Sequence, residues 1–310
     1  MGGEIDLIGQ AIWVGKSFIR CESTESLPVS PMIFLCDNGS LRPEATLALR
    51  RVALALERSL GQPVAPVSLL HSSGIDAGRL EGRPAELLEP AVAAALAGGV
   101  RSVTVLPFFF GPSAAVTAYI PERLRGLLEG NPGCELQIAA PLVRRDQSGD
   151  HRLPDALADR VRATRRARGW GVGPVVLVDH GSPQPAVGEV RNDVAARLAR
   201  VLGEPVWPCS MESREGPEYA FNRPLLAERL RLAPCDRGRV LVVQQFLAPG
   251  RHAGPGGDLD VICQEAQRDQ PELEAAMTEP VGEDPRIVEI LANRFAEAQE
   301  GPPLARSGPA

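Results

Sequence analysis

The chain has 310 residues, of which 44% are hydrophobic and 23% are charged, and its formal net charge is −6. This length allows two domains, and the composition is that of a soluble globular protein. The acidic balance argues against a general nucleic-acid-binding protein, because such proteins have a surplus of basic residues. No apolar run is long enough to span a bilayer, so we expect neither a nucleic-acid nor a membrane partner.

The cysteines and the chain ends point to a cytoplasmic protein. The six cysteines form no C-x-x-C pair, which argues against a zinc ribbon and fits a reducing compartment. Glu4 and Asp6 precede a short apolar stretch, so we predict no signal peptide. Residues 1–30 have no clear pattern and are expected to be a disordered extension. The tail at 299–310, rich in Pro, Gly and Ala, is also expected to be disordered.

Strands and helices alternate through the first half of the chain. Apolar runs predict strands, and apolar positions at helical spacing predict helices. We expect strands at 32–36, 64–70, 100–110 and 135–143, and helices at 43–59, 84–97, 121–128 and 154–167.

The second half repeats this order. We expect strands at 174–178, 206–211, 240–247 and 274–281, and helices at 186–202, 223–232, 259–268 and 285–298. Such alternation indicates right-handed βαβ crossovers and parallel sheets. The predicted fold class is therefore α/β, with two similar Rossmann-like domains at 31–168 and 174–298. A linker at 169–173 joins them, and a ligand cleft is expected between them.

The two halves share a D-x-G-S segment directly after their first strands. The second half has Asp179-His180-Gly181-Ser182, and the first half has Asp37-Asn38-Gly39-Ser40. In open α/β sheets this edge is where ligands bind.

Three polar residues of the second half follow three successive strands. They are His180, Glu212 and His252, and by our matching the first half has Asn38, His71 and Ala115 at those positions. Two imidazoles and a carboxylate suit Co²⁺, Ni²⁺, Fe²⁺ or Zn²⁺, and three ligands leave positions open for chemistry. We therefore expect one half to hold the reactive site and the other to supply a wall of the cleft.

Each of these residues also has a simpler interpretation. His180 could cap the next helix, and Glu215 is close enough to replace Glu212. The Gly-rich loop around His252 could cradle a phosphate at a helix N-terminus, although it is no Walker A motif. A histidine such as His71 is more often incidental than functional.

Several segments together resemble the sirohydrochlorin chelatases, the class II chelatases that insert cobalt for cobalamin or iron for sirohaem. The segments are 180–182, 210–217, 246–258 and 278–281. The resemblance is closest over 174–298 and extends more weakly over 31–168. It implies two α/β halves with the active site in a cleft.

The resemblance also implies roles for individual residues. His180 and His252 match the family histidines that bind the metal and assist deprotonation, and Glu212 matches the nearby carboxylate. Asn38 and Ala115 depart from the histidines of the pattern, so only one site is expected. The glycine-rich loop at 254–257 also departs and could change the metal or substrate preference.

The resulting hypothesis is a lyase that inserts Co²⁺, Fe²⁺ or Ni²⁺, as a substrate, into sirohydrochlorin or a related tetrapyrrole without an organic cofactor. A neutral imidazole can both ligate a metal and accept a pyrrole proton. Arg214, Arg251 and Ser182 are the predicted substrate-binding residues, and the arginines would bind substrate carboxylates. The simpler interpretation of Ser182 is that it caps the next helix or bonds locally. Arg191 is a further candidate, although a solvated surface charge is its commoner role.

A rival hypothesis is a metal- or tetrapyrrole-binding carrier or sensor without turnover. A two-lobed periplasmic-type binding protein would need a secretion signal, which is not evident in the sequence. The sequence leaves open the metal, the tetrapyrrole and the oligomeric state, and a monomer is compatible with it.

Overall fold

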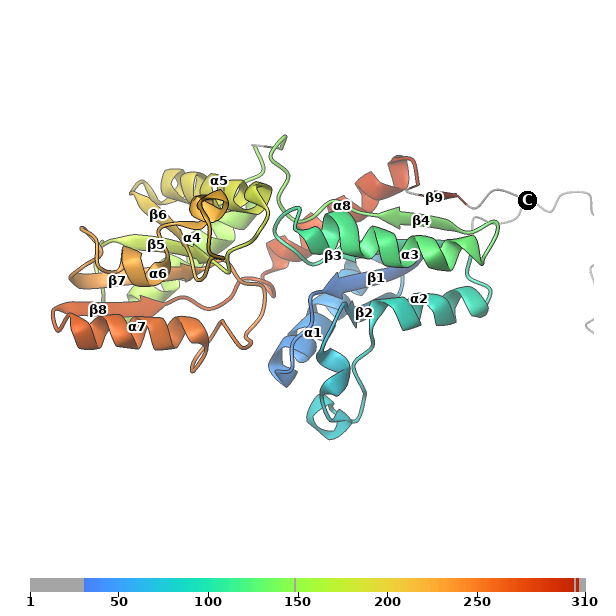
Figure 1. The fold of residues 1–310 in the computed structure, drawn as a ribbon, viewed down its shortest axis with the longest axis horizontal. Helices are drawn as coiled ribbons and strands as arrows, with labels where there is room; N and C mark the ends of the chain where they lie inside the picture. The colour runs from blue at the N-terminus through green and yellow to red at the C-terminus, as the bar shows by residue number, and fades with distance from the viewer. Residues whose placement is uncertain (1–30, 148, 304, 307–310) are drawn as a thin grey trace, which may run out of the picture. The chain divides into compact units, whose positions relative to one another are not determined.

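The computed structural model describes residues 31–147, 149–303, 305 and 306. Each half of the chain forms one sheet with helices packed on it (Figure 1). The expected N-terminal extension, residues 1–30, lies outside the described residues. Within the described part of the chain, no helix is both long and apolar enough to cross a membrane.

The first sheet has the strand order β2-β1-β3-β4-β9. Its strands are β1 (Met32–Asp37), β2 (Val64–Ser68), β3 (Ser102–Pro107), β4 (Glu135–Ile138) and β9 (Ala305–Arg306). The first four are parallel, as expected, but β9 pairs antiparallel with β4. The prediction of a disordered tail from 299 is therefore wrong in part, because the last helix continues to Glu300 and this strand follows it.

The second sheet is parallel throughout, with the order β6-β5-β7-β8. Its strands are β5 (Val175–Asp179), β6 (Val206–Ser210), β7 (Gly238–Gln244) and β8 (Leu273–Met277). Both sheets place the first strand of their half in the interior. Strand order and direction confirm the predicted α/β fold with two similar sheets.

The helices follow the expected order with two shortened members. They are α1 (Pro43–Leu60), α2 (Leu88–Ala97), α3 (Ile120–Glu129), α4 (Arg152–Arg168), α5 (Pro185–Leu202), α6 (Leu226–Arg229), α7 (Asp258–Asp269) and α8 (Pro285–Glu300). The helices expected from residues 84 and 223 begin later. In both places the preceding backbone is extended along the sheet edge, where the carbonyls of Glu86 and Pro224 accept hydrogen bonds from Ser68 and Ser210.

Each sheet is buried on both faces, which explains its nearly continuous apolar strands. In β1, Ile33 and Leu35 belong to one hydrophobic cluster while Phe34 and Cys36 belong to another. The cluster of Ile33 and Leu35 continues into the second half, where it includes Leu177 of β5. The two halves therefore share one apolar core.

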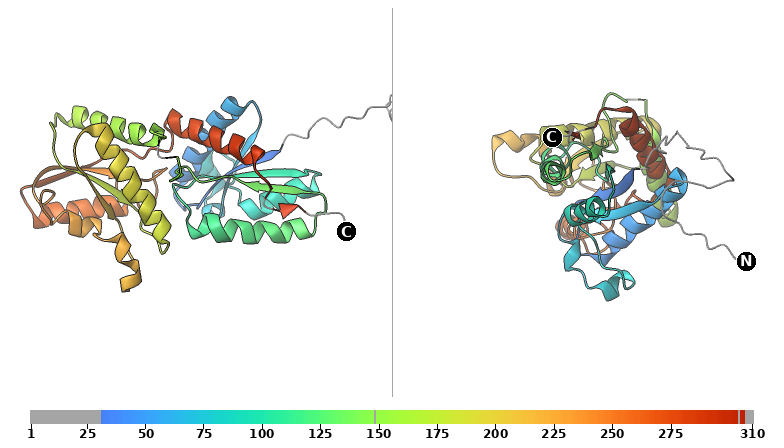
Figure 2. Two further views of the ribbon diagram at one scale, coloured as in Figure 1. Left: turned by 90° about the horizontal axis from the view of Figure 1, so that it is seen from above. Right: turned by 90° about the vertical axis from the view of Figure 1, so that its right-hand side faces the viewer.

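The last helix of each half packs on the sheet of the other half. α4 contacts α5 and β7, whereas α8 contacts α1, β3 and β4 (Figure 2). The expected division at residues 169–173 thus separates the parallel strands of the two sheets, but not these two helices or β9, which returns to the first sheet. The apolar stripe of an amphipathic helix does not say which sheet will cover it.

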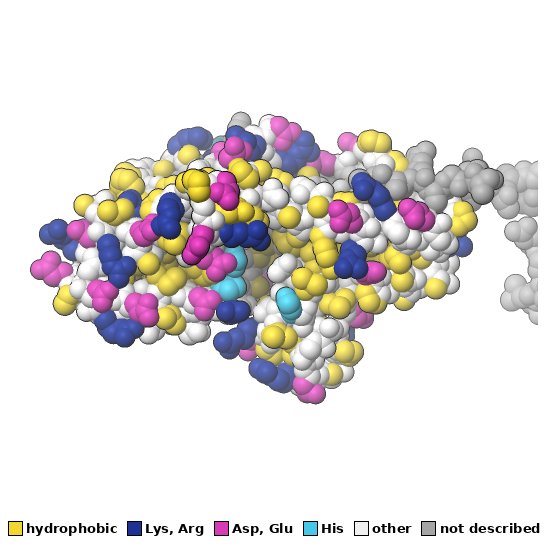
Figure 3. Space-filling view, in the orientation of Figure 1, with side chains coloured by type: hydrophobic (Ala, Val, Ile, Leu, Met, Phe, Trp, Pro, Cys, Tyr) yellow, Lys and Arg dark blue, Asp and Glu magenta, His cyan; other side chains and the backbone are white. Residues whose placement is uncertain are grey.

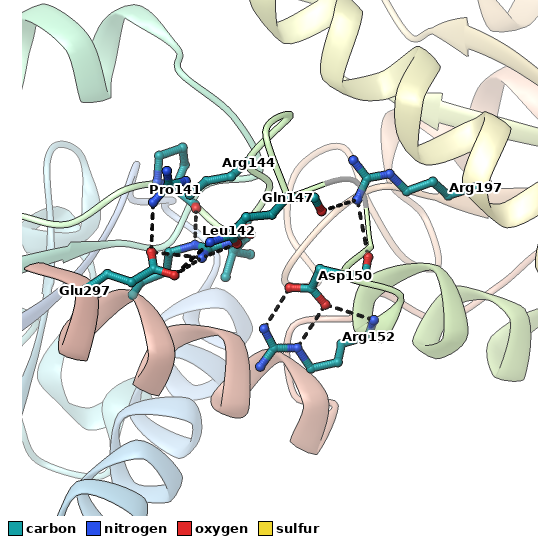
Figure 4. A network of polar contacts seen from close by, with 9 residues as sticks. Pro141, Leu142, Arg144, Gln147, Asp150, Arg152, Arg197 and Glu297 are labelled. Carbon is teal, nitrogen blue, oxygen red and sulfur yellow. Dashed lines mark hydrogen bonds and ion pairs between the residues drawn. The ribbon is translucent and has the colours of Figure 1, made fainter.

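A buried arginine fastens α8 to the segment that leads from β4 to α4. The Arg294 side chain is only 1% exposed and donates hydrogen bonds to the carbonyls of Pro141 (3.0 Å) and Leu142 (2.9 Å). It also bonds to Gln147 (2.8 Å) and to Glu297 (2.9 Å) (Figure 4). These bonds satisfy carbonyl groups that the helix crossover would otherwise leave buried and unpaired.

Replacing Arg294 by methionine keeps most of the side-chain volume but removes its donors. We expect a loss of roughly 3 kcal/mol in the free energy of unfolding, measured in urea, because buried carbonyls and Glu297 lose their partner. Arg162→Ala is the matched control, since its pair with Asp159 is about half exposed, and it should change stability by less than about 0.5 kcal/mol. Equal effects of the two substitutions would contradict this role.

Candidate active site

The polar segment after β5 is held by a glycine that no other residue can replace without strain. Gly181 has φ +93°, and a Cβ built on it would lie 2.0 Å from the carbonyl oxygen of Glu212. This close approach lets the chain after β5 run beside the chain after β6. The amide of Glu212 donates to the carbonyl of His180 at 3.2 Å.

That backbone pairing brings the first two predicted residues together. Oε1 of Glu212 lies 3.6 Å from Nε2 of His180, and both side chains are about half exposed, at 61% and 45%. Glu215, the alternative carboxylate, is exposed and forms no ion pair with His180 within the described structure. The geometry favours Glu212.

The loop after β7 places the third residue beside the first. The ring centroids of His180 and His252 are 4.7 Å apart in an edge-to-face arrangement with an angle of 75°. Gln244, the last residue of β7, fixes this loop by accepting a hydrogen bond from the amide of Gly254 at 3.1 Å. It also donates to the carbonyl of Thr278. Strands β5, β6 and β7 therefore bring their end residues to one place, as the spacing predicted.

A carboxylate not counted among the site residues orients His252. Oδ2 of Asp258, the first residue of α7, lies 2.6 Å from Nδ1 of His252. In the sequence this aspartate was visible only as the end of the Gly-rich segment. A carboxylate at one ring nitrogen fixes the tautomer and the orientation of the ring.

Both imidazoles have an oxygen acceptor at Nδ1. His180 has the carbonyl of Gly181 at 3.1 Å, and His252 has Asp258. A carbonyl oxygen can only accept, so Nδ1 of neutral His180 must hold its proton. The same assignment follows for His252, and each ring keeps the Nε2 lone pair for a metal ion or a proton.

The described residues contain no group of three or more His, Cys, Asp and Glu side chains already arranged to hold a metal ion. The two rings and Glu212 are close, but the carboxylate is exposed and free to rotate. In Figure 3, histidine side chains gather beside a hollow in the surface that basic and acidic side chains border.

A buried network supports the segment that bears His180. Ser210 lies between two charged groups, with its Oγ 2.6 Å from Oδ1 of Asp179 and 2.5 Å from a terminal nitrogen of Arg191. Burial raises the pKa of Asp179, and Arg191 acts in the opposite direction. Asn222 bonds to both the amide and the carbonyl of Ser182.

The expectation that Arg191 is a surface charge or a substrate contact is wrong, because its side chain is only 2% exposed. Sequence periodicity could not separate this buried arginine from a solvated one, since its partners come from distant segments. Ser182 behaves as predicted locally, with its hydroxyl accepting from the amide of Gln184 at 3.0 Å.

The predicted substrate-binding arginines remain exposed. Arg251 lies 3.7 Å from Asp258 and its side chain is 78% exposed, while Arg214 lies over the ring of Tyr219. The loop of Arg251 also approaches the first half, because a Cβ on Gly250 would lie 3.8 Å from Oγ of Ser40. The strand-end segments of the two halves therefore meet beside His252.

The first half repeats the scaffold without the ligands. Gly39 has φ +84°, and a Cβ built on it would lie 1.8 Å from the carbonyl oxygen of Leu70. This is the same close approach that Gly181 makes to the carbonyl oxygen of Glu212. Glu212 is therefore equivalent to Leu70, and the matching of Glu212 with His71 is wrong by one residue. The backbone pairing gives Asn38 and Leu70 as the counterparts of His180 and Glu212, so the first half keeps a ligand at neither of these positions. His71 is exposed with φ 64°.

Gly181→Ala tests the close approach. We expect a loss of roughly 3 kcal/mol or more in unfolding free energy, from left-handed strain and the clash with the Glu212 carbonyl. Gly203→Ala is the control, since Gly203 has φ +71° but open space around it, and should lose about 1–2 kcal/mol. Urea unfolding measures both, and an equal loss would show that the approach does not matter.

Asp37 gives a pH-dependent prediction. Burial raises the pKa of Asp37 from 3.8 to about 6. Its contribution to stability is therefore fully present below pH 4 and is lost as the pH rises through about 6. The unfolding free energy of Asp37→Asn, relative to that of the native chain, should therefore rise by about 2 kcal/mol as the pH increases from 4.5 to 7.5. Urea unfolding at several pH values measures this rise. A difference in unfolding free energy between the two proteins that does not change with pH would contradict the raised pKa.

Comparison with known proteins shows what the chain is similar to. Residues 174–298 match the family model CbiX. The comparison with curated protein sequences gives no match. Among the solved structures that match, three share the fold at low sequence identity, and in each case the match covers nearly the whole of the other chain.

SirB from Bacillus subtilis with Fe³⁺ is 18% identical, with a TM-score of 0.60 over 87% of this chain and 96% of that chain. SirB from Bacillus subtilis subspecies spizizenii in complex with cobalt is 18% identical, with a TM-score of 0.63 over 88% and 97%. CbiX, the terminal enzyme of sirohaem biosynthesis in denitrifying bacteria, is 17% identical, with a TM-score of 0.54 over 87% and 99%. The resemblance found in the sequence is thus confirmed, and the CbiX family model matches the second half of the chain, which bears His180, Glu212 and His252.

Proposed function

We propose that the protein inserts a divalent metal ion into sirohydrochlorin or a closely related tetrapyrrole. The observation that supports this most directly is the pair of imidazoles 4.7 Å apart with Glu212 at 3.6 Å from one of them. The CbiX match over the same residues and the fold shared with SirB add to it.

The two Nε2 atoms present the metal ion to the macrocycle. Imidazole nitrogen is a good ligand for Co²⁺, Fe²⁺ and Ni²⁺, and Glu212 completes the set by rotating toward the ion. With only these protein ligands, coordination positions remain for the incoming pyrrole nitrogens. A loosely assembled set also lets the ion leave, which a transferred metal requires.

Insertion releases two pyrrole N–H protons as the metal–nitrogen bonds form. Each neutral imidazole can accept one proton at Nε2 once its metal bond breaks, and the Asp258 carboxylate stabilises the imidazolium of His252. The Glu212 carboxylate, 3.6 Å from Nε2 of His180, stabilises the imidazolium of His180 in the same way. Metal transfer and proton removal therefore use the same atoms in sequence.

The surroundings suit a flat ring with acidic substituents. Arg214 and Arg251 are exposed and can bind substrate carboxylates, and Ser182 lies on the same loop as His180. On the equivalent edge of the first half, Leu41 and Leu70 are 63% and 40% exposed. These two leucines give the macrocycle an apolar surface where the second half has ligands.

His180→Ala and Asp258→Asn test the mechanism. We expect His180→Ala to lower the rate of Co²⁺ insertion at least about 100-fold, because a ligand and a base are lost. Asp258→Asn should lower it about 10–100-fold through the orientation of His252. The change in visible absorbance of sirohydrochlorin after mixing with Co²⁺ measures the rate. Asp269→Asn, at an exposed pair with Arg231, is the control and should keep the native rate.

The outcomes separate an enzyme from a carrier. A native rate equal to the uncatalysed rate, together with stable binding of metal or tetrapyrrole, would favour a protein without turnover. An undiminished rate in His180→Ala would remove His180 from the mechanism. A panel of Co²⁺, Fe²⁺ and Ni²⁺ in the same assay identifies the metal.

A further inference from the structure

The first half contains a cavity that the proposed reaction does not use. It lies at the edge of the first sheet, between α1, β2 and the extended segment 83–86, and has a volume of about 390 Å³. This volume is in the range of small-molecule binding sites. Its lining includes Thr46, Leu49, Ala65 and Ser68 and the charged residues Arg50, Arg83 and Glu86.

The second half fills the equivalent space with its own side chains. Helices α1 and α5 and strands β2 and β6 correspond residue by residue, as Pro43 with Pro185 and Ser68 with Ser210. Leu49 therefore corresponds to Arg191, and Ala65 to Trp207. The edge bridges of Ser68 with Leu87 and of Ser210 with Leu225 make Arg83 the counterpart of Phe221.

The counterpart of the cavity holds a guanidinium group. Arg191 donates to Oγ of Ser210 at 2.5 Å and to the carbonyl of Phe221 at 2.8 Å, and it lies 3.6 Å from Asp179. The ring of Phe221 packs closely on α5, since a Cβ on Gly188 would lie 2.8 Å from it. A planar cation and aromatic rings thus occupy the space that is open in the first half.

Asp37, beside the cavity, lacks the cationic partner that its counterpart Asp179 has in Arg191. Ser68 lines the cavity and hydrogen-bonds to Asp37, but within the described residues no cationic side chain pairs with Asp37. The pKa of Asp37 is correspondingly raised to about 6 by burial. The Thr46 side chain lines the cavity at 6% exposure and has no hydrogen-bond partner in the described structure.

The charged residues that line the cavity are Arg50, Arg83 and Glu86, and the chain itself uses the Arg50 guanidinium. The Arg50 guanidinium donates to the carbonyls of Leu80, Arg83 and Pro84 at 2.7–3.0 Å. Arg83 lies near it, and the carboxylates of Glu81 and Glu86 oppose these two cations. Asp37 lies behind Ser68 and has no cationic partner among the described residues, so the place open to a cation is the one that Arg191 holds in the second half.

We propose that this cavity binds a small organic cation whose planar head, a guanidinium or amidinium group, is attached to an apolar or aromatic body. The head donates to Ser68, next to Asp37, as Arg191 does to Ser210. The body lies over Ala65, where the second half has Trp207, and the Thr46 hydroxyl supplies a further acceptor. The site is separate from the residues of the proposed reaction and does not depend on that function.

Benzamidinium is a suitable probe, because it combines an amidinium head with an aromatic ring. Titration of the full chain at pH 7.5 by calorimetry should show saturable binding of one equivalent. Benzamide has the same shape without the charge and should bind at least about tenfold more weakly. Metal insertion plays no part in this readout, so failure of the proposed reaction would leave it unchanged.

Two variants locate the probe. Ala65→Trp introduces the side chain of the second half into the cavity and should weaken benzamidinium binding at least about tenfold. Asp37→Asn should remove the preference for benzamidinium over benzamide. A third variant, Val261→Trp, alters an exposed position on α7 and should change neither. Absence of saturable binding by the native chain, or binding that Ala65→Trp and Asp37→Asn leave unchanged, would overturn the proposal.

Discussion

The site depends on continued pairing between two chain segments beyond the ends of β5 and β6. The amide of Glu212 reaches the carbonyl of His180 only because Gly181 has no side chain to fill the space. This pairing fixes the backbone at two of the three strand ends, so that the side chains of His180 and Glu212 lie within 3.6 Å of each other. His252 joins them from the third strand, on a loop that Gln244 and Asp258 hold in place.

The two halves show which parts of this arrangement are scaffold and which are chemistry. Both halves keep an aspartate at the end of the first strand, a serine on the neighbouring strand and a left-handed glycine after them. Only the second half has the imidazoles, the carboxylate and the buried Arg191. The first half therefore shares the geometry of the strand ends, but Asn38 and Leu70 lie where the second half has His180 and Glu212. Its edge can bound a site but cannot supply ligands.

Much of the fold and of the site could be predicted from the sequence, because strand patterns and the repeated D-x-G-S segment are local signals. The crossing of α4 and α8 to the opposite sheets could not, since an amphipathic stripe does not identify its partner. The error at His71 had a similar origin: counting along a loop without its backbone pairing left the match one residue out. Arg191 and Asp258 act through contacts that sequence spacing does not reveal.

The central claim is that the imidazoles of His180 and His252 bind one metal ion together. The most direct measurement is a crystal structure of the chain loaded with Co²⁺, with anomalous scattering used to place the metal. We predict a single cobalt ion bonded to Nε2 of both histidines, at about 2.1 Å, with a Glu212 oxygen completing the protein ligands. Cobalt bound elsewhere, or bound to only one of the two rings, would contradict the account.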